Sequence, residues 1–143
     1  MMMESTTYRM GLARGFLAEA QQDLTLQRWR SCVASAQLVV ENALKAAISL
    51  FLPVPKTHDP ARLLLELVAR KQIPQPWGHA VQKLAEAGQP LGPQVHVQTD
   101  YGDEYSGRLP WDLFGEEDAN EALVVAEKVI EQVELLIQGV SNE

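Results

Sequence analysis

The sequence predicts an all-α fold: an up-and-down bundle of about five helices, with one long ordered loop before the last helix. Apolar residues recur every three or four positions in five stretches, as they do along one face of a helix. Prolines and glycines separate these stretches. The short alternating stretch at residues 95–97 has no second strand to pair with. We therefore expect one helical domain over residues 1–143, with its core between about residues 6 and 138.

The first two expected helices are long. The first covers about residues 6–23, where apolar side chains form an i, i+4 stripe. The second is the central helix, residues 27–52, which no glycine or proline interrupts and Pro53 ends. It is apolar around most of its circumference, so it must contact several partners, within the subunit or across a dimer. For this reason we expect a homodimer.

Two shorter helices are expected next. In the first, about residues 60–71, Asp59 has the position of an N-cap and Pro60 that of the first helical residue. The second begins at Pro76, and Gly88 is expected to stop it.

A long connection and a last helix complete the expected fold. Residues 89–115 show no helical pattern, but they are rich in aromatic and apolar side chains. We therefore expect this segment to pack on the bundle as an ordered loop. The last helix is expected over residues 116–138, and its first three residues are acids, which the helix dipole favours there.

The net charge of −7 is unevenly distributed. Residues 1–99 contain ten Lys and Arg against seven acids, whereas residues 100–143 contain two against twelve. Duplex DNA is therefore not an expected partner, because binding it requires many cations. No signal peptide and no apolar run of the ~20 residues that span a membrane are present, so we expect a cytoplasmic protein. The single cysteine, Cys32, excludes an internal disulfide and is expected to be buried.

Three polar residues, Glu41, Asn42 and Lys45, interrupt the apolar surface of the central helix. Glu41 and Lys45 are four positions apart, in the order that favours an ion pair. Charges on so apolar a helix are costly unless they are paired or line a cleft. Two interpretations follow. The pair is a structural or dimer-interface bond, or Lys45 contacts a phosphate or another anion while Glu41 positions the ligand.

The segment Val40–Ala46 resembles the E-x-A-x-K-A core of HEPN domains, the "higher eukaryotes and prokaryotes nucleotide-binding" helical bundles. Other motifs of that family follow in the same order, and the resemblance covers about residues 8–138. These motifs are an early Phe16-Leu17-x-x-Ala20, Thr57-His58-Asp59 before a leucine-rich helix, Thr99-x-Tyr101-x-Asp103 in place of T-R-Y-P-D, and Pro110-x-x-x-Phe114 before the Ala-rich last helix.

The resemblance implies a helical bundle that dimerises and often partners a small nucleotidyltransferase encoded beside it. Some members of the family are ribonucleases, whose signature is an Arg and a His four to six residues apart. None of the histidines here, His58, His79 and His96, has an Arg at that distance upstream. In addition, Asp100 stands where the T-R-Y-P-D motif has its Arg.

The candidate ligand-binding residues outside the central helix are His58, Tyr101, Asp103 and Tyr105. The tyrosines can stack on a base, but they can equally anchor the loop to the bundle. His58 can serve as a ligand contact or bind a carbonyl beside the helix cap. We expect no catalytic residue and no cofactor. We also expect no metal site, because the histidines lack companions at metal-ligand spacing.

Three hypotheses about function follow. The first is a non-catalytic HEPN-type module that binds a nucleotidyltransferase partner and a nucleotide or substrate. The second is a ribonuclease toxin of a toxin–antitoxin pair, with an atypical site built from His58, Tyr101 or Arg108 near the dimer interface. The third is a plain interaction subunit without a small-molecule ligand.

Overall fold

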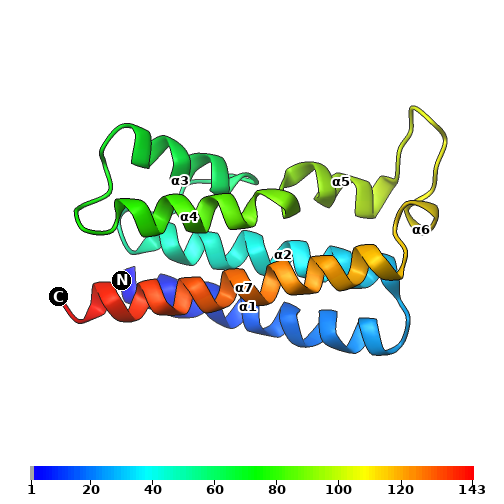
Figure 1. The fold of residues 1–143 in the computed structure, drawn as a ribbon, viewed down its shortest axis with the longest axis horizontal. Coiled ribbons are helices and arrows are strands. Elements are labelled where there is room, and N and C mark those ends of the chain that lie inside the picture. Colours follow the sequence, from blue (N-terminus) through cyan, green and yellow to red (C-terminus); the bar gives the residue numbers. More distant parts are fainter. Residues whose placement is uncertain (1) are drawn as a thin grey trace.

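The longest helices of the protein, α1, α2 and α7, lie side by side (Figure 1). The structure, a computed structural model, describes residues 2–143; Met1, which the expected domain includes, lies outside this range. α1 and α2 run in opposite directions, and α7 runs parallel to α2 (Figure 1). The arrangement confirms the expected all-α bundle. The bounds are Met2–Thr25 for α1, Trp29–Ser49 for α2 and Glu116–Ser141 for α7.

Shorter elements cover another side of α2 and lead the chain back to α7 (Figure 1). Each of them contacts α2, and α4 also packs on α7. Their bounds are Pro60–Ala69 for α3, Gly78–Gly88 for α4, Gln89–Leu91 for the 3-10 turn η1, Pro93–Tyr101 for α5 and Pro110–Leu113 for α6.

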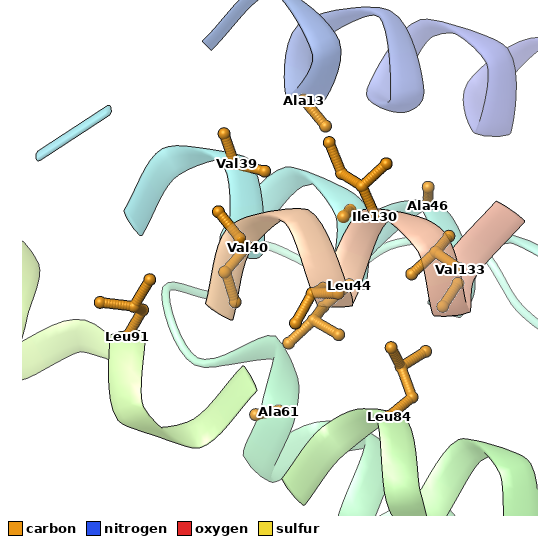
Figure 2. Packing of buried hydrophobic residues seen from close by; sticks show 14 of the residues in the cluster. Ala13, Val39, Val40, Leu44, Ala46, Ala61, Leu84, Leu91, Ile130 and Val133 are labelled. Carbon is orange, nitrogen blue, oxygen red and sulfur yellow. The ribbon is translucent and has the colours of Figure 1, made fainter. Parts of the chain in front are cut away.

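The centre of the core is α2, in which sixteen of the 21 residues are buried. Its side chains meet a different neighbour on each side: Val39 lies toward α1, while Leu44 lies between α7 and α4 (Figure 2). Full burial of a Leu or Val contributes roughly 1.5–3 kcal/mol, so this helix supplies much of the stabilising apolar burial.

A dimer was expected because the central helix is apolar around most of its circumference, and the burial of α2 within one chain removes this reason. The apolar circumference of α2 is covered within one chain by α1, α3, α4, α5 and α7. A second copy is therefore not needed to shield it. Dimerisation remains a prediction, which the burial of α2 does not require.

The expected starts at Pro60 and Glu116 are confirmed, whereas α4 begins at Gly78 and not at Pro76, and the role of one glycine is corrected. Asp59 accepts a hydrogen bond from the Arg62 amide at 3.2 Å and caps α3. α4 ends at Gly88 as expected, but the backbone there has a φ of −86°, so no left-handed stop is formed. The glycine is required by close packing instead: a Cβ at this position would lie 2.8 Å from Cδ1 of Leu44.

The expected loop over residues 89–115 is partly wrong, because it contains η1, α5 and α6. Pro93 occupies the first turn of α5, and Gly102 ends the helix with a positive φ of 70°. Residues 95–97 are helical and not extended. Within residues 2–143 the only β-type pairing is an isolated bridge between Asp103 and Arg108. It closes a short hairpin that projects from the bundle (Figure 1).

Two expectations from composition can be compared with the structure. Cys32 is fully buried, as predicted, and its Sγ lies 3.7 Å from the carbonyl oxygen of Ala119. Among the described residues, no helix is long and apolar enough to cross a membrane.

Candidate functional site

Glu41 and Lys45 form an ion pair on the face of α2 that α3 and η1 approach. Lys45 Nζ donates to Glu41 Oε2 at 3.2 Å, and both residues are more than nine-tenths buried. The other carboxylate oxygen, Oε1, accepts a 3.4 Å hydrogen bond from the amide of Gln37, one turn earlier. A buried charge is tolerated when such partners are present. The chain therefore satisfies both charges internally, without a dimer partner.

Gln37 extends this arrangement to α5. Its Oε1 lies 3.1 Å from His96 Nδ1, and its Nε2 also approaches the carbonyl oxygen of Leu91 at 3.5 Å. Since the amide oxygen only accepts hydrogen bonds, His96 Nδ1 is the donor. The other ring nitrogen of His96, Nε2, faces the carboxylate of Asp100 at 4.0 Å.

His58 joins the same group from the loop before α3. Its Nδ1 lies 3.9 Å from Glu41 Oε2, and its ring is stacked on that of His96 with centroids 6.4 Å apart and planes 17° apart. The loop is fixed locally: the Asp59 amide donates to Thr57 Oγ1 at 3.0 Å, and Asp59 caps α3. We call Gln37, Glu41, Lys45, His58 and His96 the polar cluster.

α5 is held in register with this cluster by an arginine of α2. Arg30 Nη1 donates to the carbonyl oxygen of Thr99 at 2.8 Å, and the Thr99 hydroxyl donates to the His96 carbonyl at 2.8 Å. The guanidinium of Arg30 also lies 5.9 Å from the ring centre of Trp111. His96 is therefore positioned by an anchored helix and not by a loose loop.

The polar cluster is closed on the inside and open at one edge. The crevice between Glu41, His58 and Leu91 has a volume of about 10 Å³, close to the minimum for one water molecule. The side chain of His58, in contrast, is 84% exposed, and that of His96 is 42% exposed. A larger ligand can therefore reach the two imidazoles but cannot enter beside the ion pair.

Asn42 does not belong to this cluster. It faces α1, where its Oδ1 accepts from Arg9 Nη1 at 3.3 Å and its Nδ2 donates to the Leu38 carbonyl at 2.9 Å. The structure therefore places it as a link between α1 and α2.

The other expected site residues form a second group, around the hairpin that follows α5. Tyr101, Asp103 and Tyr105 line one shallow pocket, which contains neither His58 nor Glu41. Tyr101 and Tyr105 are strongly exposed, so neither anchors this segment to the bundle. Asp103 Oδ1 accepts from the Tyr105 amide at 3.1 Å, and Asp103 Oδ2 accepts from the Ser106 hydroxyl at 2.8 Å.

These contacts assign Asp103 a local structural role. The hydrogen bonds from Ser106 hold the pKa of its carboxyl below the ordinary value. Arg108, which was expected near His58 in the ribonuclease hypothesis, instead donates from Nη2 to the Asp112 carbonyl at 2.8 Å. The candidate residues thus fall into three places: Glu41, Lys45 and His58 in the polar cluster, Asn42 between α1 and α2, and Tyr101, Asp103 and Tyr105 at the hairpin.

Sequence reasoning missed Gln37 and His96. Gln37 lies four positions before Glu41 on the same apolar helix, so the signal that singled out Glu41 applied to it as well. His96 was missed because its segment was read as a loop. In a helix, the spacing of four between His96 and Asp100 would have indicated neighbouring side chains.

A family model of the HEPN domain matches residues 8–136, nearly the whole chain. The chain belongs to the HEPN domain family. Its fold is also similar to the crystal structure of TT1696 from Thermus thermophilus, with a TM-score of 0.69 and 27% sequence identity over 90% of this chain and 95% of that chain. No curated protein matches the sequence. In this HEPN domain, the E-x-A-x-K-A motif supplies the buried ion pair, and the Thr57–Asp59 segment brings His58 to it.

Proposed function

We propose that this HEPN domain is a non-catalytic binding module, a cytoplasmic homodimer that partners a small nucleotidyltransferase and binds a nucleotide or that enzyme's substrate. The proposal is based on the exposed edge of the polar cluster. There two stacked imidazoles, His58 and His96, are accessible, while the charges behind them are already paired. Such an arrangement exposes part of each imidazole ring to a ligand and holds His96 in place through its hydrogen bond to Gln37.

The ligand that fits this edge is an anion such as a nucleotide phosphate. An imidazole N–H donates to a phosphate oxygen, and a protonated histidine adds a positive charge. Because His96 Nδ1 already donates to Gln37, this ring offers a donor only at Nε2 and only as the imidazolium, 4.0 Å from the Asp100 carboxylate. Lys45 acts indirectly in this proposal, because its ammonium neutralises Glu41 at 3.2 Å. Without it, the Glu41 carboxylate beside His58 would repel an anion.

The nucleotidyltransferase partner and the dimer follow from membership of the family and not from a contact in this chain. Co-expression with the nucleotidyltransferase encoded nearest to this gene tests the partnership. The expected result is a complex that stays together through size-exclusion chromatography. Sedimentation of the protein alone tests the dimer, and a single species of about one chain's mass, 15.9 kDa, would exclude it.

The nucleotide site is tested by isothermal titration with ATP. The variant His58→Ala/His96→Ala is expected to lose binding, whereas His79→Ala, which alters an exposed histidine on α4, is expected to bind as the wild type does. Equal binding by all three proteins would exclude the polar cluster as the site.

A second candidate function is RNA cleavage, and the geometry of the two imidazoles favours it. In this reaction one imidazole takes the proton of a ribose 2′-hydroxyl, whose oxygen then attacks the adjacent phosphorus. The other imidazole gives a proton to the departing 5′-oxygen, which leaves a 2′,3′-cyclic phosphate. His58 and His96 are close enough to act on one phosphodiester, since their ring centroids are 6.4 Å apart.

Incubation of the purified protein with single-stranded RNA separates the two functions. Cleavage that is lost in His58→Ala and in His96→Ala would support a ribonuclease that uses this pair of imidazoles. Absence of cleavage together with ATP binding supports the binding module. Absence of both, with a stable nucleotidyltransferase complex, leaves a plain interaction subunit.

A further inference from the structure

Exposed apolar side chains are concentrated on α5, α6 and the hairpin between them (Figure 1). Ten large apolar side chains are exposed among the described residues, and half of them lie between positions 97 and 111: Val97, Tyr101, Tyr105, Leu109 and Trp111. Tyr101 is 67% exposed, and Tyr105 is fully exposed. Single exposed apolar residues are normal, but a concentration that is rich in aromatic rings marks a binding surface.

The hairpin is a rigid support for these rings. Asp103 and Arg108 exchange two backbone hydrogen bonds, of 2.8 and 3.0 Å. Gly102 turns the chain with a positive φ of 70°, and a Cβ there would collide with the carbonyl oxygen of Arg108. Asp103 closes the tip by accepting hydrogen bonds from the amides of Tyr105 and Ser106. A support that is already ordered lowers the entropic cost of binding a partner.

Both tyrosines line one shallow pocket of about 530 Å³ between α5 and the hairpin. The polar side chains beside them are the amides of Gln94 and Gln98 on α5 and the carboxylates of Asp103 and Glu104 on the hairpin. Glu104 is exposed and makes no ion pair with the described residues. No basic residue is among those that line the pocket. The surface therefore combines two aromatic rings with amide oxygens and negative charge.

We infer that this pocket receives an arginine side chain of a partner protein. A guanidinium group stacks on aromatic faces, and its N–H groups donate to carboxylates and amide oxygens that lie in its plane. The ammonium group of lysine is more strongly hydrated and has no plane to stack, so it fits this pocket less well. The inference stands apart from the proposed function, because it concerns a different pocket and assumes neither a nucleotide nor a nucleotidyltransferase.

The charge of the pocket argues against a nucleotide or RNA, although tyrosine rings also stack on bases. A nucleotide carries phosphate, which the two carboxylates repel. The nearby arginines are engaged elsewhere: Arg108 donates to the Asp112 carbonyl at 2.8 Å, and Arg30 donates to the Thr99 carbonyl at 2.8 Å. Neither of them lines the pocket. A positively charged group is therefore the ligand that the lining residues favour.

The shape of the pocket favours a protein over a free guanidinium compound. A small ligand is usually held with most of its surface buried, which a shallow pocket beside the fully exposed ring of Tyr105 does not provide. A protein adds further contacts, for example with the exposed Leu109 and Trp111. Residues 97–112 contain four acids and one arginine, so the same surface of a second copy would bring the same excess of negative charge. The partner is therefore a protein with a basic surface.

Four short peptides test the site on the full chain. Each has about ten residues and blocked ends, with one variable residue between two leucines and only glycine and serine elsewhere. The variable residue is arginine, lysine, glutamate or citrulline, which has the shape of arginine without its charge. NMR titration of the isotope-labelled protein is expected to show saturable shifts at residues 94–105 with the arginine peptide, with a Kd below about 1 mM. The lysine peptide should bind about threefold more weakly, the citrulline peptide about tenfold more weakly, and the glutamate peptide not at all.

Substitutions in the pocket make the test specific. Tyr101→Ser/Tyr105→Ser is expected to weaken binding of the arginine peptide by about fivefold or more, and Glu104→Gln by about threefold. The matched controls are Tyr8→Ser, which alters an exposed tyrosine on α1, and Glu127→Gln, which alters an exposed acid on α7. Both controls should bind as the wild type does. All of these side chains are exposed, so the variants should fold.

Absence of saturation at roughly 10 mM arginine peptide would overturn the inference. Equal binding of the arginine and citrulline peptides, or equal loss in the pocket variants and the controls, would also overturn it. Three further results would assign the pocket to another occupant and exclude this one. Saturable shifts at residues 94–105 with a short oligouridylate would indicate RNA. Binding of N-acetylarginine methylamide as tight as that of the arginine peptide would indicate a small molecule. Loss of self-association in Tyr101→Ser/Tyr105→Ser, measured by sedimentation, would indicate a second copy of the chain.

Discussion

Gln37 on α2 and His96 on α5 are joined by a 3.1 Å hydrogen bond, although 59 positions separate them in the sequence. The same glutamine donates to Glu41 at 3.4 Å, so one amide connects an exposed imidazole to a buried ion pair. Because an amide offers both a donor and an acceptor, it can serve these two neighbours at once. The residues of the cluster are therefore connected by hydrogen bonds. We expect a substitution at the buried Glu41–Lys45 pair to alter the arrangement of the imidazoles at the exposed edge.

The first prediction concerns the buried end. Lys45→Met removes the partner of the Glu41 carboxylate and is expected to lower the free energy of unfolding by about 3 kcal/mol, since an unpaired buried charge is costly. Glu41→Gln/Lys45→Met removes both charges and should be destabilised less than the single variant. Urea unfolding monitored by circular dichroism measures both. A loss below about 0.5 kcal/mol in the single variant, typical of an exposed pair, would contradict the buried pair.

The second prediction concerns the packing of α4 on α2. Gly88→Ala places a Cβ 2.8 Å from Cδ1 of Leu44 and 3.1 Å from Cγ1 of Val40. Such overpacking is expected to cost about 1–3 kcal/mol in thermal unfolding. Gly11→Ala is the control, because its added Cβ meets nothing within 4 Å and alanine favours a helix interior. This control should be neutral or stabilising by up to ~1 kcal/mol.

The third prediction concerns Cys32. Burial, with a contribution from Asp23, raises the pKa of its thiol from 9.0 to about 11. The native protein should therefore react slowly with Ellman's reagent at pH 8 and rapidly once unfolded. Above pH 9 the unfolded state loses the thiol proton first, so stability should fall as the pH rises toward 11. In Cys32→Ala the free energy of unfolding should fall less over this pH range. An equal fall in both proteins would contradict the raised pKa of Cys32.

The fourth prediction concerns the arginine that positions α5. Arg30→Ala removes the 2.8 Å hydrogen bond to the Thr99 carbonyl and the contact with the Trp111 ring. We expect faster amide exchange in α5, a shift of tryptophan emission and a loss of about 1–2 kcal/mol of stability. Arg28→Ala is the matched control, because its exposed side chain makes no cap hydrogen bond at the start of α2. Equal exchange in α5 of both variants would show that Arg30 does not hold this helix.

Periodicity predicted the long helices well, because α2 and α7 bury nearly continuous apolar faces. It failed for α5, in which Thr99 is the only buried residue, so no apolar stripe marks this helix. Its start at Pro93 and its end at Gly102 were the available signals. Elsewhere the observed helix ends differ from the predicted ones by a few residues. For example, α2 ends at Ser49 and not at Leu52.

The site was predicted only where a local sequence pattern marks its residues. Glu41 and Lys45 were visible as charges on an apolar helix, and a spacing of four is a local property. His58 and His96 meet only because the loop before α3 and the helix α5 both pack against α2, and no local pattern encodes that contact. Tyr101 and Tyr105 were selected for their chemistry, yet the projecting hairpin and the end of α5 place them in a different pocket.

Nucleotide binding at the edge formed by His58 and His96 is tested most directly by following the ring resonances of the three histidines by NMR during titration with ATP. His79 is an internal control, because it is exposed on α4 and lines a different pocket. We expect the His58 and His96 signals to shift together and saturate while those of His79 stay in place. Equal shifts of all three histidines, or no shift of His58 and His96, would contradict this expectation.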